Sequence, residues 1–268
     1  NAYMPYFSPD GRWLAFEMDA KAHKVRLDGS LPLIITGAYG ANGADWTVRN
    51  EIVFGAQGPF KGLSRVSAAG GETVALTEPD STRGELAWMW LDGTVEAVTS
   101  EDRPLMSPQL SPDGGRAAAL VGDLGNADVW IYDFAMGTFS RLTSMGQVTL
   151  LEWAPDGSHL IFAGGVEGTV WTQAASGGEP AQVLYQQDAL LPQATLSPDG
   201  RALLATTLSG ENRSLDIIRV DLDSAAVAQD FLDTPADELA PAFSPDGKWV
   251  ALESSESGRR EVYVRSFP

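Results

Sequence analysis

The chain has 268 residues, 44% of them hydrophobic, which is enough for one large all-β domain or two small domains. Its formal net charge of −18 makes nucleic acid and anionic lipid poor partners, because both repel an acidic surface. The absence of cysteine excludes disulfides, zinc–thiolate sites and a thiol nucleophile, and no apolar run is long enough to span a bilayer.

A four-residue motif recurs along the chain and sets the order of the predicted elements. Ser-Pro-Asp-Gly begins at residues 8, 111, 197 and 244, and Ala-Pro-Asp-Gly begins at residue 154. From residue 111 on, the starts lie about 43–47 residues apart, a period typical of four-stranded propeller blades. Two degenerate copies fill the long first interval, at 44–54 and 85–93.

The residues around each motif predict four short strands. A first strand ends just before the motif, as in 3–7, and an apolar strand follows it, as in 13–16. An alternating strand such as 128–133 and a last short strand such as 139–143 complete the repeat. The final repeat ends at its third strand, 261–267.

These elements predict a single all-β domain, residues 1–268, folded as a β-propeller with four-stranded antiparallel blades. One blade near residues 80–110 is expected to be degenerate, because its repeat is cut to two strands. Six blades are therefore favoured, with seven as the alternative. The first and last blades are expected to close the ring by packing rather than by a shared strand.

The motif itself has the chemistry of a tight turn. Proline presets φ, aspartate bonds nearby backbone amides, and glycine accepts a positive φ. One such joint is needed between the first and second strands of every blade. The motif aspartates are therefore predicted to be structural; they are Asp10, Asp113, Asp156, Asp199 and Asp246.

Two sets of segments carry a family resemblance. The pattern "FSPDGRWLAF" at 7–16, with strands such as "DVWIYD" at 128–133, resembles the TolB-like β-propellers over nearly the whole chain. Segments 62–80 and 244–268 resemble the propellers that follow the kinase domain in some bacterial receptor-like serine/threonine kinases. This resemblance implies an extracytoplasmic or periplasmic bacterial module that binds partners or ligands. The chain itself has no kinase signature.

Acidic residues gather near the predicted innermost strands, whose side chains converge on the central channel. The metal-site candidates are Asp188, Asp237, Glu238 and Glu152, and Asp45 and Glu85 hold related positions. Such carboxylates can hold a hard cation such as Ca²⁺ or form a solvated acidic funnel. Three further acids precede third strands and are expected to bond loop amides: Asp128, Asp216 and Glu261. His159 is predicted to lie on the surface.

The favoured function is a non-catalytic binding, sensor or protein-interaction module, with a protein or a small molecule as its ligand. The alternative is a calcium-dependent hydrolase of the lactonase or phosphotriesterase kind, with an acidic metal site in the channel. Neither nucleic acid nor membrane insertion is expected. An exposed edge at strand 261–267 predicts weak self-association.

Overall fold

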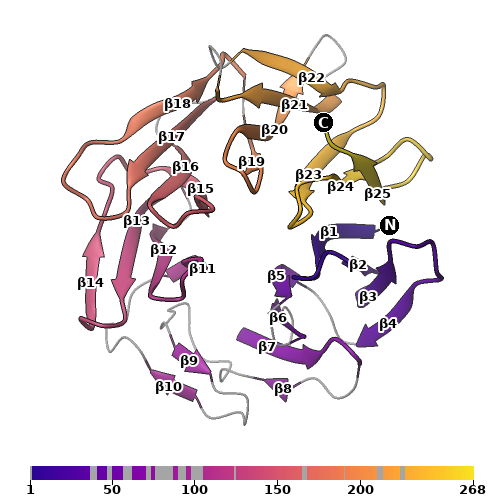
Figure 1. The fold of residues 1–268 in the computed structure, drawn as a ribbon, viewed down its shortest axis with the longest axis horizontal. Helices are drawn as coiled ribbons and strands as arrows, with labels where there is room; N and C mark the ends of the chain where they lie inside the picture. The colour runs from indigo at the N-terminus through magenta and orange to yellow at the C-terminus, as the bar shows by residue number, and fades with distance from the viewer. Residues whose placement is uncertain are drawn as a thin grey trace.

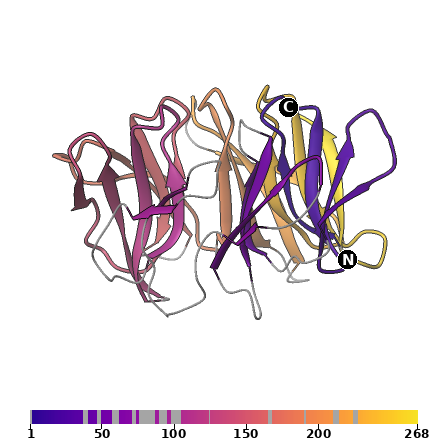
Figure 2. The same ribbon diagram turned by 90° about the horizontal axis from the view of Figure 1, so that it is seen from below.

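The chain forms a ring of β-sheets. The computed structural model describes residues 2–36, 41–46, 50–56, 62–70, 74–75, 87–89, 95–97, 105–123, 125–164, 168–189, 191–209, 214–223 and 227–268. Every regular element in these ranges is a strand, and none is a helix that could cross a membrane. The sheets stand around a central axis (Figure 1), and the ring is seen from the side in Figure 2. The predicted all-β propeller is confirmed.

The strands follow one another in chain order. The first ten are β1 (Ala2–Phe7), β2 (Trp13–Met18), β3 (Lys21–Arg26), β4 (Leu33–Thr36), β5 (Ala41–Trp46), β6 (Glu51–Ala56), β7 (Gly62–Ser67), β8 (Val74–Ala75), β9 (Ala87–Met89) and β10 (Val95–Ala97). The next eight are β11 (Leu105–Leu110), β12 (Arg116–Asp123), β13 (Asn126–Asp133), β14 (Thr138–Arg141), β15 (Val148–Trp153), β16 (His159–Gly164), β17 (Thr169–Ala174) and β18 (Gln182–Gln186). The last seven are β19 (Gln193–Leu196), β20 (Ala202–Ser209), β21 (Ser214–Asp221), β22 (Ala228–Leu232), β23 (Glu238–Phe243), β24 (Trp249–Ser254) and β25 (Glu261–Ser266).

Consecutive strands pair antiparallel into one sheet per repeat. Among the described residues, five sheets have four strands, β23–β25 has three, and β9–β10 has two. The two-stranded sheet lies at the predicted degenerate repeat. Counting that sheet as a blade gives seven blades, and leaving it out gives six.

The second strand of a blade has an apolar middle because neighbouring blades cover both of its faces. In β16, Leu160, Ile161, Phe162 and Ala163 are all buried. Phe162 packs in a core shared with the preceding sheet, whereas Ile161 packs in the core shared with the following one. The cores therefore lie between blades, and burial of both sheet faces explains the run without polar alternation.

Three innermost strands share a bulge, and in two of them the bulge turns a backbone amide toward the preceding blade. Met4, Ser107 and Ala240 have φ of 52°, 48° and 52°, each is followed by a proline, and the pairing register shifts there. A proline fits this edge because it has no N–H to pair. Met4 N donates to Glu253 Oε1 at 2.8 Å, and Ala240 N donates to Gln193 Oε1 at 2.7 Å.

Two hydrogen bonds from backbone amides of β1 join the first sheet to the last one and close the ring. Besides the bond from Met4 to Glu253, Ala2 N donates to Arg260 O at 2.8 Å. No strand among the described residues pairs with the outer edge of β25. Packing and these bonds therefore join β1 to β23–β25, as expected from the sequence.

Candidate binding surfaces and charged sites

The repeated turn is held by its own side chains. After β19, Asp199 Oδ1 accepts hydrogen bonds from Ser197 Oγ at 2.6 Å and from Arg201 N at 3.1 Å. Ser197 Oγ in turn accepts from Ala202 N at 2.9 Å. These bonds, the one from Ser197 first, hold the pKa of Asp199 below its usual value. Gly200 has φ of +72°, which favours glycine at that position.

The other four turns follow the same plan with one exception. The serine-to-aspartate bonds are 2.6 Å for Ser8–Asp10, 2.6 Å for Ser111–Asp113 and 2.7 Å for Ser244–Asp246. The fifth turn has Ala154 in place of the serine, and Asp156 accepts from Ser158 Oγ at 2.7 Å instead. This geometry supports the structural prediction for all five aspartates.

Replacing Asp199 by alanine tests that prediction. The variant loses two acceptor bonds in an exposed turn, so we expect the free energy of unfolding to fall by about 0.5–2 kcal/mol. Asp223→Ala is the matched control, because Asp223 only pairs with Arg201 in an exposed ion pair, 3.4 Å from its Nε. Thermal unfolding measures both. An Asp199→Ala protein that kept its full melting temperature would contradict the structural role.

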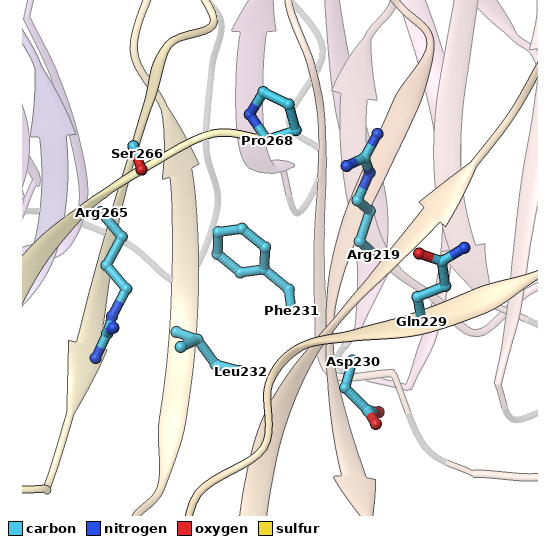
Figure 3. A pocket seen from close by; sticks show the side chains of 8 residues that line it. All are labelled: Arg219, Gln229, Asp230, Phe231, Leu232, Arg265, Ser266 and Pro268. Atoms are coloured by element: carbon cyan, nitrogen blue, oxygen red, sulfur yellow. The ribbon is translucent and has the colours of Figure 1, made fainter.

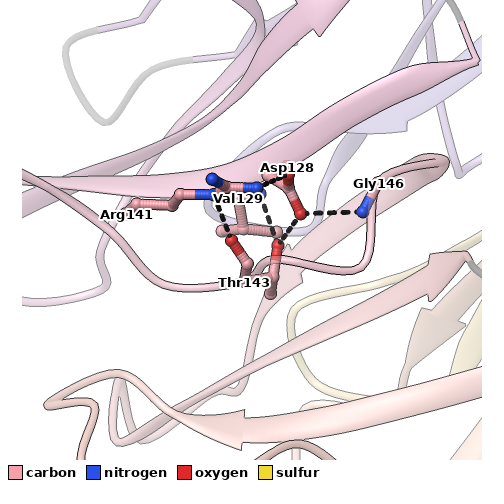
Figure 4. Close-up of polar contacts among 5 residues, drawn as sticks. All are labelled: Asp128, Val129, Arg141, Thr143 and Gly146. Atoms are coloured by element: carbon pink, nitrogen blue, oxygen red, sulfur yellow. Dashed lines mark hydrogen bonds and ion pairs between the residues drawn. The ribbon is translucent and has the colours of Figure 1, made fainter.

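A buried acid, Asp128, anchors the loop that leads from β14 to β15 (Figure 4). Its Oδ1 accepts from Thr143 Oγ1 at 2.8 Å and from Gly146 N at 3.1 Å, and its Oδ2 pairs with Arg141. Thr143 Oγ1 also accepts from Val129 N at 2.9 Å. Burial alone would raise the pKa of Asp128, but these bonds outweigh it and hold the pKa below its usual value. The expected bonding to a loop amide is present here.

The matching acid of the sheet β19–β22, Asp216, has a different environment. It is the third residue of its strand, as Asp128 is of β13, but Asp230 pairs with Ile218 where Arg141 pairs with Trp130 in the other repeat. Asp216 is only 3% exposed. Burial raises its pKa, and neighbouring carboxylates, Asp233 first, raise it further. This repeat therefore keeps the buried acid without the arginine.

Glu238 lies beside this acid at the start of β23 and is 1% exposed. Its Oε1 accepts a hydrogen bond from Thr234 Oγ1. Its Oε2 is buried and has no hydrogen-bond partner among the described residues. Burial raises the pKa of Glu238 against the bond from Thr234, and the charge of Asp216 adds to the rise. Asp216 and Glu238 therefore both have pKa values above the usual ones.

Glu152 links two innermost strands across a blade junction. Its carboxylate on β15 accepts from Thr195 Oγ1 at 3.2 Å and from Leu196 N at 3.3 Å, both on β19. The Leu196 amide points away from β20, since the next residue donates to Ala202 O. Burial raises the pKa of Glu152 to about 7 despite these two bonds. Glu152 therefore changes charge near neutral pH.

The metal-site candidates do not share one rim of the channel. Glu152 stands two residues before its turn, whereas Glu238 stands six residues before its own. At about 3.3 Å per residue, the two acids lie toward opposite ends of their strands. Asp237 neighbours Glu238, and Asp188 is exposed in the loop between β18 and β19. The side chains of Asp45 and Glu85 lie outside the described residues.

No metal site is assembled within the described ranges: no group of three or more His, Asp or Glu side chains there is arranged to hold a metal ion. His159, predicted to be a surface residue, is exposed at the start of β16. His23 is 5% exposed and stacks on Phe16 with ring centroids 5.7 Å apart. Neither histidine joins an acidic cluster.

The outer edge of β25 offers unpaired backbone groups. Phe267 N donates to Lys248 O at 2.7 Å, so odd-numbered residues of this strand face β24. In an antiparallel ladder the alternate residues point the other way. The N–H and C=O groups of Val262, Val264 and Ser266 therefore face the edge that no described strand covers.

A groove of about 540 Å³ runs between this strand and β22 (Figure 3). Phe231 lies in its middle, with Arg265 on one side and Arg219 on the other. The Arg219 guanidinium lies 4.9 Å from the ring centre of Phe267, and its buried Nε has no hydrogen-bond partner among the described residues. The groove is therefore a basic, aromatic site on an otherwise acidic chain.

Arg219 and Glu253 were not singled out from the sequence, although each is a charged residue within an otherwise apolar run. Arg219 interrupts the apolar run Ile217–Val220 in β21, and Glu253 ends the apolar run of β24. A charged residue in such a run often marks a specific contact, because an unpaired buried charge is costly. Arg219 lines the groove at β25, and Glu253 bonds Met4 where the ring closes.

One curated protein is similar to this chain over part of its length. The chain is 26% identical over 192 residues to YuxL of Bacillus subtilis, described as an uncharacterized peptidase. The match covers 55% of this chain and 29% of the relative, so the chain spans less than a third of that protein. No protein-family model matches the chain.

Comparison with solved structures shows the fold. TolB from Acinetobacter baumannii matches with a TM-score of 0.65 and 20% identity, over 99% of this chain and 60% of TolB. An oligogalacturonate lyase in complex with manganese matches with a TM-score of 0.73 and 14% identity, over 99% of this chain and 89% of the lyase. The chain thus shares the β-propeller fold of TolB and of the lyase, and a fold shared by such different proteins leaves the function open.

Proposed function

We propose that the chain is a non-catalytic module that recognises protein partners outside the cytoplasm. The observation that carries the proposal is the open edge of β25 beside a basic, aromatic groove. The resemblance to extracytoplasmic propellers and the presence of TolB among the structural neighbours support the location. A small-molecule ligand at the same groove is the competing occupant.

The edge of β25 suits an added strand. Three outward residues supply both donors and acceptors, and an extended segment from another chain satisfies such groups by pairing with them. Val264 is 36% exposed beside the edge and adds apolar surface. Arg265 places one charge beside this edge, and no described strand covers it.

A second copy of this chain is a self-complementary partner for that edge. Antiparallel pairing about Tyr263 brings the outward residues Val262 and Val264 of the two copies together. The same register puts Glu261 of one copy opposite Arg265 of the other. Opposite charges facing each other across a strand pair contribute roughly 0.2–1 kcal/mol, so the association is weak.

Sedimentation at several protein concentrations tests the edge. We expect the mean mass of the native chain to rise with concentration. Val264→Pro removes an outward N–H without touching the ladder with β24, so it should weaken association at least about tenfold. Val264→Thr keeps the N–H and is the matched control. A native chain that stays strictly monomeric, with fast exchange of the amides at 262, 264 and 266, would rule out self-association.

The second candidate function is a calcium-dependent hydrolase, favoured by the buried acids at the start of β23. Glu238 has an unpartnered carboxylate oxygen among the described residues, and Asp216 and Asp237 stand close to it. A hard cation is the natural complement of such oxygens. One of the similar structures is a lyase in complex with manganese. This candidate needs a metal, and the binding module does not.

Calcium therefore separates the two candidates. For the binding module we expect the same melting temperature in excess calcium and in chelator at matched ionic strength. A bound ion at about 100 times its dissociation constant stabilises the fold by about 2.7 kcal/mol. A calcium-dependent rise that disappears in Glu238→Gln, but persists in the surface variant Glu179→Gln, would favour the hydrolase.

A further inference from the structure

The turns of neighbouring blades pack against one another at three of four junctions. A methyl group placed on Gly157, Gly247 or Gly11 would lie 3.4, 3.6 or 3.7 Å from the turn proline of the preceding blade. At Gly200 the same methyl group would meet nothing within 4 Å. This turn contact is therefore missing between the sheets β15–β18 and β19–β22, which are neighbours in the ring (Figure 1).

An arginine bridges the preceding junction, which lies between the sheets β11–β14 and β15–β18. Arg116, the first residue of β12, donates from Nη2 to Gly157 O at 2.8 Å in the next sheet. Its guanidinium carbon lies 5.0 Å from the ring centre of Trp153. One long side chain thus bridges the two turns and covers the aromatic residue at the end of β15.

The residues that correspond to Arg116 and Trp153 are smaller at the junction between the sheets β15–β18 and β19–β22. His159 begins β16 as Arg116 begins β12, and Leu196 ends β19 as Trp153 ends β15. The imidazole is too short to repeat the bridge, and it turns back to Ser158 Oγ, 2.7 Å from its Nδ1. A groove of about 550 Å³ opens between the two sheets.

The groove has an apolar interior and an anionic mouth. Ile161, Leu184, Leu196 and Leu222 line it, together with the turn aspartates Asp156 and Asp199. Hydrogen bonds, those from the turn serines first, hold the pKa of both aspartates below the usual value, so both are charged at neutral pH. Nε2 of His159 adds a ring nitrogen for a ligand. A volume of this size suits a small peptide segment.

We propose that this groove binds a peptide segment of a partner protein that presents an aliphatic side chain next to a lysine or arginine. The aliphatic side chain fills the leucine-lined interior, and the cationic group meets the carboxylates of Asp156 and Asp199. Complementary charge favours a basic partner, because the chain carries a net charge of −18. The site is separate from the edge of β25 and belongs to a different junction of the ring.

The test uses the peptide acetyl-Gly-Lys-Leu-Lys-Gly-amide and the methyl NMR signals of Ile161, Leu184 and Leu196. We expect saturable shifts with a dissociation constant of ~1 mM or below, and at least about tenfold weaker binding of acetyl-Gly-Glu-Leu-Glu-Gly-amide. His159→Arg copies the sealed junction, so it should keep the melting temperature and weaken binding at least about tenfold. Lys248→Arg, on the turn of another blade, should bind as the native chain does.

Three results would overturn the proposal. They are no shift of these methyl signals with the basic peptide, equal binding of the acidic peptide, or full binding by a folded His159→Arg protein. Binding of octylamine without binding of the peptide would overturn the peptide assignment in favour of a small amphiphile. Val264→Pro, which closes the β25 edge, should leave peptide binding here unchanged, so the two surfaces succeed or fail separately.

Discussion

Replacing Asp128 by alanine is expected to lower the free energy of unfolding by about 2–4 kcal/mol, more than any other single change considered for this chain. The variant leaves the Thr143 hydroxyl and the Gly146 amide without their acceptor in a buried place. It also leaves Arg141 without its carboxylate. The loop from β14 to β15 would lose the contacts that fix it. Chemical unfolding measures the loss.

Asp133→Ala on the same strand is the control, because Asp133 caps an exposed turn through a single bond to Met136 N at 2.9 Å. It should cost at most about 1 kcal/mol. The difference between the native chain and Asp128→Ala also depends on pH. The folded-state pKa of Asp128 lies below its unfolded value near 3.8, so its stabilisation is present above that value and is lost as pH falls through the folded-state pKa. Equal stabilities at neutral pH would contradict the anchoring role.

Replacing Glu152 by glutamine is expected to stabilise the protein at pH 8 and to leave it unchanged near pH 4. The pKa of Glu152 rises from 4.5 in the unfolded chain to about 7 in the folded one. The native chain therefore loses stability as pH rises between these values, because the folded state resists ionisation. Discounted for solvent screening, the gain in the variant at pH 8 is about 1–3 kcal/mol. Glutamine keeps a bond to both Thr195 and Leu196.

Melting curves between pH 4 and pH 8 give the measurement, with the exposed Glu179→Gln as the matched control. At pH 8 both variants remove one negative charge, so any effect of net charge at that pH is common to them. Only Glu152→Gln should diverge from the native chain as pH rises. Parallel pH profiles for Glu152→Gln and the native chain would show that Glu152 is already ionised at little cost in the folded protein.

The sequence predicted the blades well because blade signals are local. The apolar run at 13–16 lies within β2, the alternating run at 128–133 lies within β13, and the run at 261–267 contains β25. In four of the five turns the serine and aspartate side chains of the motif bond each other. The described strands 87–89 and 95–97 lie where the sequence predicted a repeat cut to two strands.

The candidate sites were predicted less well because they depend on pairs of blades. The sequence suggested that Glu152 lies at the rim of the channel. In the structure its carboxylate accepts hydrogen bonds from Thr195 and Leu196 of β19, which lie 43 and 44 residues further along the chain. Asp216 matches Asp128 in sequence, yet only the folded chain shows that its repeat lacks the arginine partner. Spacing along one strand cannot show which neighbouring side chain faces it across a junction.

The amino-acid sequence by itself determined the repeat and the joint in each blade, because turn chemistry and strand periodicity act over a few residues. Tertiary structure decided where the ring is sealed and where it is not. Arg116 closes one junction and His159 leaves the next one open, although both stand at the same place in their repeats. The physical reason is the length of the side chain. Whether a side chain spans a junction depends on its length and on the residue opposite, and only folding brings these two residues together.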